Sequence, residues 1–410
     1  MISLKNSIKS WNDAKNIIPG GTNTISKRVD RFAGDGRFPA FAEKGEGAYL
    51  EDVDGNRYID YIAALAPIII GYNDSRINQK IVEQLSKGVL FSLPTTAEIE
   101  LSELLIEVIP CAEMVKLLKT GAEANSAAIR AARLHTGKEL ILSCGYQGWH
   151  DWWAVNQSQE GIPDQEKHLT LTFNFNDLKS AQELVKKNKD KIACIILTAA
   201  LYGHHPDKYF LIGLRKLADE NGILLIFDEV ITGFRWALGG AQSYYQVTPD
   251  LATFGKAMAN GMPIAALTGK REIMQPLKDN WITSTYASEA LSIVAAIETI
   301  KILKNTDAIE RLYQNAKTLR QGIEEIAIRN NIQINVNDLV PVVVFNFSHI
   351  NAIKETFQND FLAACANEGI LLRKEDETGF SMCLMVALTE KDLEKTLRII
   401  EKVTLQILLS

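Results

Sequence analysis

Asp228 and Lys256 are the residues of this sequence whose types and surroundings best suit amine chemistry. Asp228 ends the apolar run ILLIF in GILLIFDEVITGFR, where a buried carboxylate is costly unless a cation or hydrogen-bond donor compensates it. A protonated pyridine nitrogen is such a cation. Lys256 follows the short apolar run LATF in PDLATFGKAMANGMP, and a partly desolvated lysine there can form a Schiff base. This pair can hold pyridoxal phosphate at the mouth of an α/β sheet.

Each of these residues also has an interpretation that requires no ligand. Asp228 can cap a helix after its strand, with Glu229 simply solvated. A single lysine is in most cases a solvated surface residue. The choice depends on what else the sequence places nearby.

A third element, KLLKTGAEANSAAIRAARLHTG, contains a predicted helix that starts at Thr120 and stops at Gly137. Free backbone amides at Gly121 and Ala122 and the positive end of the helix dipole suit a phosphate. Thr120 and Glu123 also match a capping box, which needs no phosphate.

A fourth element is the aromatic segment SCGYQGWHDWW, directly after the apolar run LILS. Tyr146 is placed to lay its ring on a flat cofactor, and Gln147 is expected among the rim groups of such a site. The alternative is an aromatic loop packed on the core. His150, His204 and His205 lack the spacing and partners of a metal site, so no metal is assigned.

The elements that must position these residues alternate between helical periods and short apolar runs. This pattern over residues 98–270 predicts an α/β fold with a mostly parallel sheet covered on both faces, whose ligands bind at the carboxyl ends of the strands. The predicted helices are 98–109, 122–136 and 210–221, and the predicted strands are VKLL, LILS, IACIIL, ILLIF, LATF and IAAL.

Three parts of the chain are expected. Residues 1–70 form an amino-terminal segment that joins the small domain and contains a hairpin turning at Asp54-Gly55. Residues 71–309 form the large domain. Residues 310–410 form a small carboxy-terminal domain, with strands VPVVVFNF and SMCLMVAL and a closing helix opened by Thr389.

Composition excludes several classes of function. The chain has 410 residues, 47% of them hydrophobic, and a net charge of −6, which disfavours nucleic acid and other polyanions as partners. The five cysteines are isolated, as expected for reduced thiols. The start of the sequence has no signal-peptide core and no apolar run is long enough to span a bilayer, so a cytoplasmic location without membrane contact is expected.

The order of these motifs resembles the class III, fold-type I pyridoxal-phosphate-dependent aminotransferases, and most of all their glutamate-1-semialdehyde aminomutase branch. The resemblance runs from PGGTNT to TEKDLEKT, and IFDEV, GFR and GKAMANGMP are its most specific motifs. It implies a large domain with a mostly parallel seven-stranded sheet, a smaller α+β domain, and a homodimer.

The resemblance also implies roles for individual residues. Lys256 would be the Schiff-base lysine and proton shuttle, and Asp228 would keep the pyridine nitrogen protonated. Val230 and Tyr146 would pack on the two ring faces. The remaining cofactor contacts would be the amides of Gly121 and Ala122 and, from across the dimer interface, Thr285.

Several positions depart from the family pattern. Ala122 lacks a hydroxyl that the family usually places at the phosphate, and Thr198-Ala199 replaces a Glu-Pro pair. Thr24, Lys27 and Leu65 replace residues of the aminomutase substrate site, where an arginine would bind a carboxylate. Thr24, Lys27, Leu65 and Gln147 are therefore the candidate substrate residues.

The predicted activity is transfer of an amino group from a small-molecule donor to a carbonyl acceptor by ping-pong transamination. An amino-sugar or surface-polysaccharide precursor is one candidate substrate. Two alternatives stay open: a glutamate-1-semialdehyde 2,1-aminomutase, and a noncatalytic binding subunit that keeps the fold.

Overall fold

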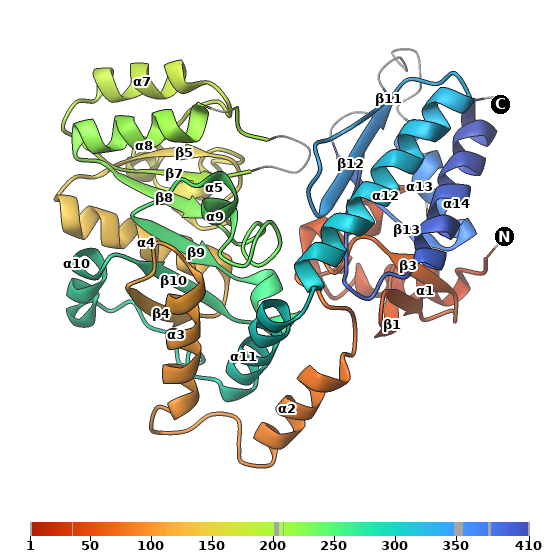
Figure 1. The fold of residues 1–410 in the computed structure, drawn as a ribbon, viewed down its shortest axis with the longest axis horizontal. Helices are drawn as coiled ribbons and strands as arrows, with labels where there is room; N and C mark the ends of the chain where they lie inside the picture. The colour runs from red at the N-terminus through yellow and green to blue at the C-terminus, as the bar shows by residue number, and fades with distance from the viewer. Residues whose placement is uncertain are drawn as a thin grey trace. The chain divides into compact units, whose positions relative to one another are not determined.

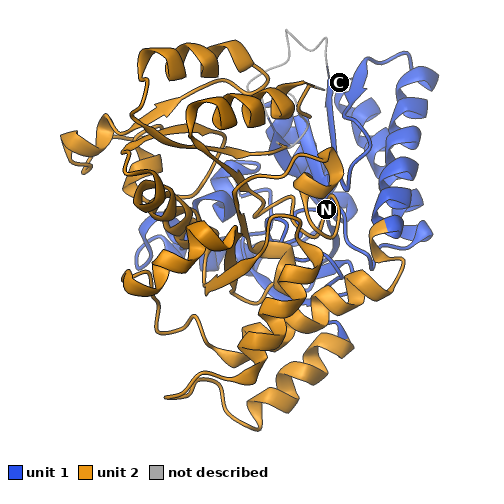
Figure 2. Ribbon diagram, turned by 60° about the vertical axis from the view of Figure 1, so that its left-hand side comes forward, with its two compact units in different colours: residues 1–74, 310–410 blue, residues 75–309 orange. Residues whose placement is uncertain are grey.

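The structure is a computed structural model that describes residues 2–34, 36–200, 205–207, 209–347, 356–375 and 379–408. His204 lies outside these residues. The chain divides into two compact units, one made of residues 1–74 and 310–410 and the other of residues 75–309 (Figure 2).

The unit of residues 75–309 is built on a seven-stranded sheet with the order β4-β10-β9-β8-β7-β5-β6 (Figure 1). Only β10 runs antiparallel to its neighbours β4 and β9, so the prediction of a mostly parallel sheet in an α/β fold is confirmed. The strands are β4 (Met114–Leu118), β5 (Leu140–Cys144), β6 (Thr170–Thr172), β7 (Ile192–Thr198), β8 (Leu224–Asp228), β9 (Leu251–Phe254) and β10 (Ala265–Gly269).

Helices pack on this sheet. The helices of the unit are α2 (Ser75–Leu85), α3 (Thr96–Val108), α4 (Gly121–Thr136), α5 (Asp151–Ala154), α6 (Asp164–Lys167), α7 (Leu178–Lys187), α8 (Phe210–Asn221), α9 (Ala241–Tyr245), α10 (Arg271–Met274) and α11 (Ala290–Asn305). Helix α4 contacts β7, β8, β9 and β10, and α8 contacts β8. The 3₁₀ turns η4 (Lys256–Ala259) and η5 (Gln275–Asp279) follow β9 and α10.

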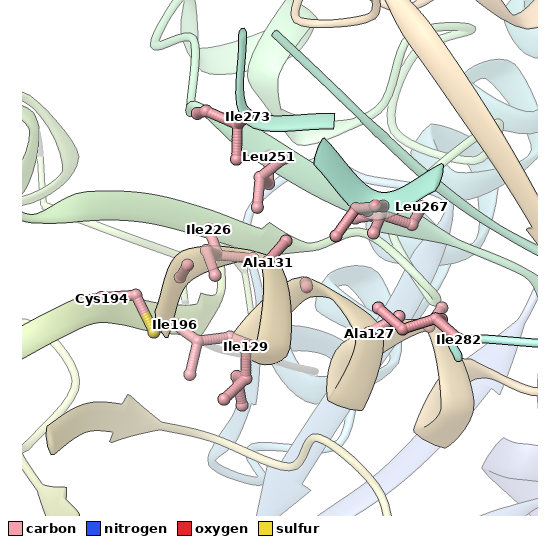
Figure 3. Packing of buried hydrophobic residues seen from close by; sticks show 14 of the residues in the cluster. Ala127, Ile129, Ala131, Cys194, Ile196, Ile226, Leu251, Leu267, Ile273 and Ile282 are labelled. Atoms are coloured by element: carbon pink, nitrogen blue, oxygen red, sulfur yellow. The ribbon is translucent and has the colours of Figure 1, made fainter. Parts of the chain in front are cut away.

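The packing under α4 decides which way Asp228 points. Cys194, Ile196 and Ile226 from the sheet form one buried cluster with alanines of α4 (Figure 3). Because side chains alternate between the faces of a strand, Asp228 lies on the same face of β8 as Ile226. The carboxylate at the end of β8 therefore points to the side that α4 covers.

The unit of residues 1–74 and 310–410 holds two four-stranded sheets, β1-β2-β3-β13 and β11-β12-β15-β14. The strands are β1 (Ala42–Glu46), β2 (Tyr49–Asp52), β3 (Arg57–Asp60), β11 (Ile334–Val336), β12 (Val342–Phe347), β13 (Ile370–Leu371), β14 (Arg373–Glu375) and β15 (Gly379–Cys383). Its helices are α1 (Lys5–Ala14), α12 (Ala308–Arg329), α13 (Phe357–Glu368) and α14 (Glu390–Leu408), together with three 3₁₀ turns, η1 (Pro19–Gly21), η2 (Ile25–Lys27) and η3 (Val29–Arg31).

The hairpin predicted at Asp54-Gly55 is present, since β2 and β3 pair antiparallel and Gly55 has a φ of 82°. Thr389 precedes α14 as expected, and its hydroxyl accepts a hydrogen bond from the amide of Asp392 (3.3 Å). The predicted strand SMCLMVAL is wrong beyond Cys383, where β15 ends and the chain turns.

Among the described residues, no helix is long and apolar enough to cross a membrane.

Candidate active site

Asp228 is a buried carboxylate whose two oxygens are held in place by neighbouring donors. Only 4% of the residue is exposed. Its Oδ2 accepts from Asn125 Nδ2 (2.7 Å), and its Oδ1 accepts from the amide of Val230 (3.0 Å). Burial raises the pKa of Asp228 to about 6, although these hydrogen bonds and the charge of Lys256 act in the opposite direction.

Asn125 connects Asp228 to the rest of the site. It lies in the second turn of α4 and is 1% exposed. Its Nδ2 also donates to the carbonyl of Gln147 (2.9 Å), and its Oδ1 accepts from Thr253 Oγ1 (2.6 Å). Sequence reasoning missed Asn125 and Thr253; the available signal was an amide side chain inside an alanine-rich helix that starts at the proposed phosphate site.

Lys256 starts the turn η4 directly after β9, and it is half-buried. Its φ is 40°, in the left-handed region that a residue with a side chain adopts at an energetic cost. Such strain is typical of functional positions. The charge of Lys256 lowers the pKa of Asp228, so the two side chains share one electrostatic environment.

Val230 lies between the start of α4 and the residue before Lys256. A Cβ atom built on Gly121 would come within 2.8 Å of Val230 Cγ2, and one built on Gly255 within 3.6 Å of Val230 Cγ1. Gly121 therefore lets the helix start approach Val230 closely. Asp228, Val230, Lys256 and the first turn of α4 form one site.

The start of α4 can hold an anion. Thr120 and Glu123 form the predicted capping box, with the amide of Glu123 donating to Thr120 Oγ1 (3.2 Å) and the amide of Thr120 donating to Glu123 Oε2 (3.1 Å). The amides of Gly121 and Ala122 have no acceptors inside the helix, since they belong to its first turn. The capping box and a phosphate site are therefore compatible.

The segment after β5 lies along this helix start. A Cβ atom on Gly148 would be 2.7 Å from Ala122 Cβ, so the segment touches α4 there. Tyr146 is 60% exposed, and its ring meets Trp153 edge to face at 4.7 Å. Thr198, at the end of β7, donates through Oγ1 to the carbonyl of Tyr146 (3.3 Å).

The structure corrects the expected place of Gln147. Its side chain is 1% exposed and is not a rim group. Oε1 accepts from Ser143 Oγ (2.8 Å) and Nε2 donates to the carbonyl of Cys144 (2.7 Å), so both ends of the amide bind the end of β5. Gln147 shapes the segment that carries Tyr146.

Glu229 is likewise buried, which rules out the solvated side chain of the ligand-free alternative for Asp228. It is fully buried and accepts hydrogen bonds from the amides of Ala241 (2.7 Å) and Gln242 (2.9 Å) and from the Thr232 hydroxyl. Burial raises the pKa of this carboxyl group, and these donors oppose that rise. Glu229 thus stabilises the turn after Asp228.

The candidate substrate residues Thr24, Lys27 and Leu65 lie in the other unit. Thr24 precedes η2 and Lys27 ends it, with the lysine exposed. Leu65 is half-buried and has a φ of 74°, within four successive left-handed residues, Ala63 to Ala66.

Asp60 stabilises this unusual turn. It is 2% exposed, and it accepts hydrogen bonds from the amide of Ile62 (2.8 Å) and the Tyr72 hydroxyl (2.6 Å). A buried carboxylate with two hydrogen-bond donors therefore stabilises the turn.

Thr285 is exposed in the segment before α11, inside the unit that contains Lys256. Among the described residues, no group of three or more His, Cys, Asp and Glu side chains could hold a metal ion.

The fold and the site define a class of enzyme. A mostly parallel sheet with a buried aspartate, a strained lysine and a capped helix start at its carboxyl end agrees with a family model described as Aminotransferase class-III, which matches residues 32–404. The chain belongs to the class III aminotransferases, which use pyridoxal phosphate.

Individual relatives cover most of the chain. It is 40% identical to a 3-aminobutyryl-CoA aminotransferase of Cloacimonas acidaminovorans, over 82% of this chain and 81% of the relative. It is 37% identical to a glutamate-1-semialdehyde 2,1-aminomutase of Chlorobium phaeobacteroides, over 97% of each. The FumI protein of Sphingopyxis sp. MTA144, solved in its PLP internal aldimine form, has a TM-score of 0.90 at 26% identity and matches 98% of this chain and 96% of that one.

Proposed function

We propose that this protein is an aminotransferase in which Asp228 and Lys256 bind pyridoxal phosphate, and that it moves an amino group from a donor to a carbonyl acceptor by ping-pong transamination. The observation that carries the proposal is the buried carboxylate of Asp228, whose pKa is raised to about 6 in a site it shares with Lys256. A carboxylate that is costly to bury is stabilised by a cationic partner.

The side chains have distinct parts in this proposal. Asp228 holds a proton at the ring nitrogen, and Asn125 and the amide of Val230 keep the carboxylate oriented. The bound cofactor supplies an electron sink. Lys256 would hold the cofactor through its amine and would move a proton at the substrate carbon. Val230 and Tyr146 flank the ring.

Phosphate binding is assigned to the start of α4. The amides of Gly121 and Ala122 donate to it, and the helix dipole favours its charge. Thr285 is proposed to contact the phosphate of a neighbouring subunit, which makes the protein a homodimer.

An apolar surface in residues 82–99 supports the homodimer. Val82 (64% exposed), Leu85 (55%), Phe91 (44%), Leu93 (76%) and Ile99 (60%) are large apolar side chains on α2, α3 and the segment between them. Large apolar side chains that gather on one face mark interaction surfaces, and α2 and α3 both pack against α11. The carbonyl of Val89 in the same segment accepts a hydrogen bond from the amide of Ala290 (2.9 Å), so this surface adjoins the segment that carries Thr285.

Transamination is favoured over aminomutation by the residues of the other unit. Thr24, Lys27 and Leu65 stand where an aminomutase has its substrate-binding groups, and Lys27 alone provides a cation among them. The 3-aminobutyryl-CoA aminotransferase named above suggests a substrate whose amino group is on the carbon β to an acyl carbonyl. An amino-sugar or surface-polysaccharide precursor stays a second candidate, and a cytoplasmic location is proposed for either.

A half-reaction tests the proposal. Purified protein loaded with pyridoxal phosphate is mixed with single amino donors while the visible absorption band of the bound cofactor is recorded. We expect a donor to bleach the band and a carbonyl acceptor, added after the donor is removed, to restore it. Protein that binds the cofactor but is bleached by no donor would support the noncatalytic alternative.

The aminomutase alternative has its own assay. Glutamate 1-semialdehyde is added to the loaded protein without a donor or acceptor, and 5-aminolevulinate is measured. Formation of that product at a rate above that of any transamination would overturn the choice of aminotransferase.

A further inference from the structure

Lys119 and Glu289 form an ion pair that joins two parts of the site. Lys119 Nζ lies 3.0 Å from Glu289 Oε2, and each side chain is 13% exposed. A pair so shielded from water is costly to break, because the remaining charge loses its partner while it stays largely buried. Most ion pairs of the described residues have at least one side chain that is more than 20% exposed, so this pair is unusual for the molecule.

Lys119 belongs to the anion-binding end of α4. It lies between the end of β4 and Thr120, and its amide donates to Glu123 Oε2 (2.9 Å), the same oxygen that accepts from the amide of Thr120. Glu123 thus holds the backbone of both residues. Lys119 is therefore tied to the helix turn that contains the amides of Gly121 and Ala122.

Glu289 belongs to the start of α11. It is the N-cap of this helix, and its Oε1 accepts from the amide of Leu291 (2.7 Å) and its Oε2 from the amide of Ser292 (3.2 Å). Its own amide donates to the carbonyl of Tyr286 (3.1 Å), which closes the turn that follows Thr285. Burial raises the pKa of Glu289, but hydrogen bonds from Ser292 and Lys119 outweigh it and leave the pKa lowered, so the side chain is a carboxylate.

Helix α11 also contacts the turn that begins with Lys256. It packs against η4, the turn that Lys256 begins, and against α2 of the apolar surface. One ion pair therefore joins the start of α4 to a helix that contacts the Lys256 turn and is preceded by Thr285.

We infer that Lys119 and Glu289 are positioning residues that fix the Thr285 segment against the phosphate end of α4, so that phosphate binding in one subunit is coupled to the segment offered to its neighbour. This inference rests on the proposed function. Lys119 has a second effect: it balances the charge of Glu289, which would otherwise repel a phosphate at the start of α4.

The test uses variants that separate the charge of each residue from its other role, which is packing for Lys119 and helix capping for Glu289. Lys119→Met removes the cation and keeps an apolar stem, whereas Lys119→Arg keeps the charge. Glu289→Ser keeps a capping oxygen and removes the charge, because serine is a good N-cap. Lys301→Met is the matched control, since Lys301 lies on α11 and also pairs with a glutamate, but its pair with Glu100 is exposed, at 46% for the lysine and 53% for the glutamate.

Comparing two ligands, one with and one without a phosphate, distinguishes an effect on the phosphate site from a general loss of stability. Dissociation constants are measured by absorbance titration for pyridoxal phosphate and for pyridoxal, which lacks the phosphate, and the dimer dissociation constant is measured with and without cofactor by sedimentation velocity. We expect Lys119→Met to raise the dissociation constant of pyridoxal phosphate about tenfold, which corresponds to a loss of 1.4 kcal/mol. The dissociation constant of pyridoxal should change less than twofold. Cofactor should tighten the parent dimer and should tighten this variant less.

Glu289→Ser should add little to the loss in Lys119→Met, because both variants break the same pair. Lys119→Arg and Lys301→Met should behave like the parent. The inference would be overturned if the binding of both ligands were weakened equally. It would also be overturned if the binding losses of Lys119→Met and Glu289→Ser were fully additive. If the parent protein itself binds no pyridoxal phosphate, the proposed function fails instead, and the two failures are thereby distinguished.

Discussion

At the scale of single residues, Asp228 has opposite effects on folding and on cofactor binding. Without a cationic partner its carboxylate is buried at a cost, and this cost is reflected in the rise of its pKa to about 6 from an ordinary value of 3.8. A cationic ring nitrogen would remove the cost. The same burial that destabilises the cofactor-free protein therefore favours the cofactor.

The pH dependence of stability follows from the sign of this shift. Because the pKa is higher in the folded state, the stabilising contribution of the protonated group is complete below about pH 4 and is lost as the pH rises through about 6. This difference in pKa between the folded and unfolded states corresponds to about 3 kcal/mol of folding free energy. We expect the urea midpoint of cofactor-free Asp228→Asn, taken relative to the parent, to be higher at pH 8 than at pH 4, because the hydrogen bond that the asparagine loses to Asn125 or Val230 costs the same at both pH values.

The control for this measurement is Asp279→Asn, because Asp279 is exposed. It should change the midpoint little at either pH. A midpoint of Asp228→Asn relative to the parent that does not rise between pH 4 and pH 8 would contradict the account of Asp228. The same variant should bind pyridoxal phosphate at least tenfold more weakly, as measured by titration.

The sequence could predict Asp228 and Lys256 because each follows an apolar run that reads as a buried strand. It could not predict Asn125, whose importance depends on three partners from β5, β8 and β9 and their adjoining segments. The burial of Gln147 and Glu229 could not be predicted for a related reason. Polar residues in loops read as solvated unless the sequence reveals the buried donors that satisfy them.

At the scale of secondary structure elements, the contact between α4 and the segment after β5 shapes the site. Gly148 has a φ of 120° and lies against Ala122, where an added Cβ atom would be 2.7 Å from Cβ and 3.0 Å from Cα. Since the second of these atoms is backbone, the segment itself would have to move. Tyr146 belongs to that segment.

We expect Gly148→Ala to displace the segment and to destabilise the protein by roughly 1–3 kcal/mol, from overpacking and from a φ that disfavours a side chain. Gly161→Ala is the control, since Gly161 also has a positive φ (78°) but an added Cβ would contact nothing within 4 Å. Thermal unfolding and cofactor titration measure both variants. Equal effects of the two substitutions would show that the contact with Ala122 is unimportant.

Most strands of the large sheet could be predicted, because central strands buried on both faces form continuous apolar runs such as ILLIF. The antiparallel direction of β10 could not, since an apolar run carries no direction. The pairing of β3 with β13 could not be predicted either, because its partners Ile59 and Ile370 are separated by most of the sequence.

At the scale of the whole molecule, the proposed homodimer requires the apolar surface of residues 82–99 to be covered. Leu93 is its most exposed member at 76%. We expect Leu93→Asp to raise the dimer dissociation constant at least tenfold, because a charge would have to be buried in the interface. Sedimentation velocity over a range of protein concentrations measures this.

Ile212→Asp is the control for the dimer, because Ile212 is a 53% exposed apolar residue on α8, outside this surface. It should leave the dissociation constant unchanged. A Leu93→Asp protein that dimerises as tightly as the parent would place the interface elsewhere and would remove the support that this surface gives to the role of Thr285.

The central claim is that Lys256 binds pyridoxal phosphate covalently. The loaded protein is treated with borohydride, which makes the bond between an amine and the cofactor permanent, and is then digested and mapped by mass spectrometry. We predict one labelled lysine, in the peptide that contains Lys256, with no label in Lys256→Ala and the parent amount in Lys270→Ala. A label on another lysine, or none at a cofactor concentration that saturates the absorption band, would contradict the claim.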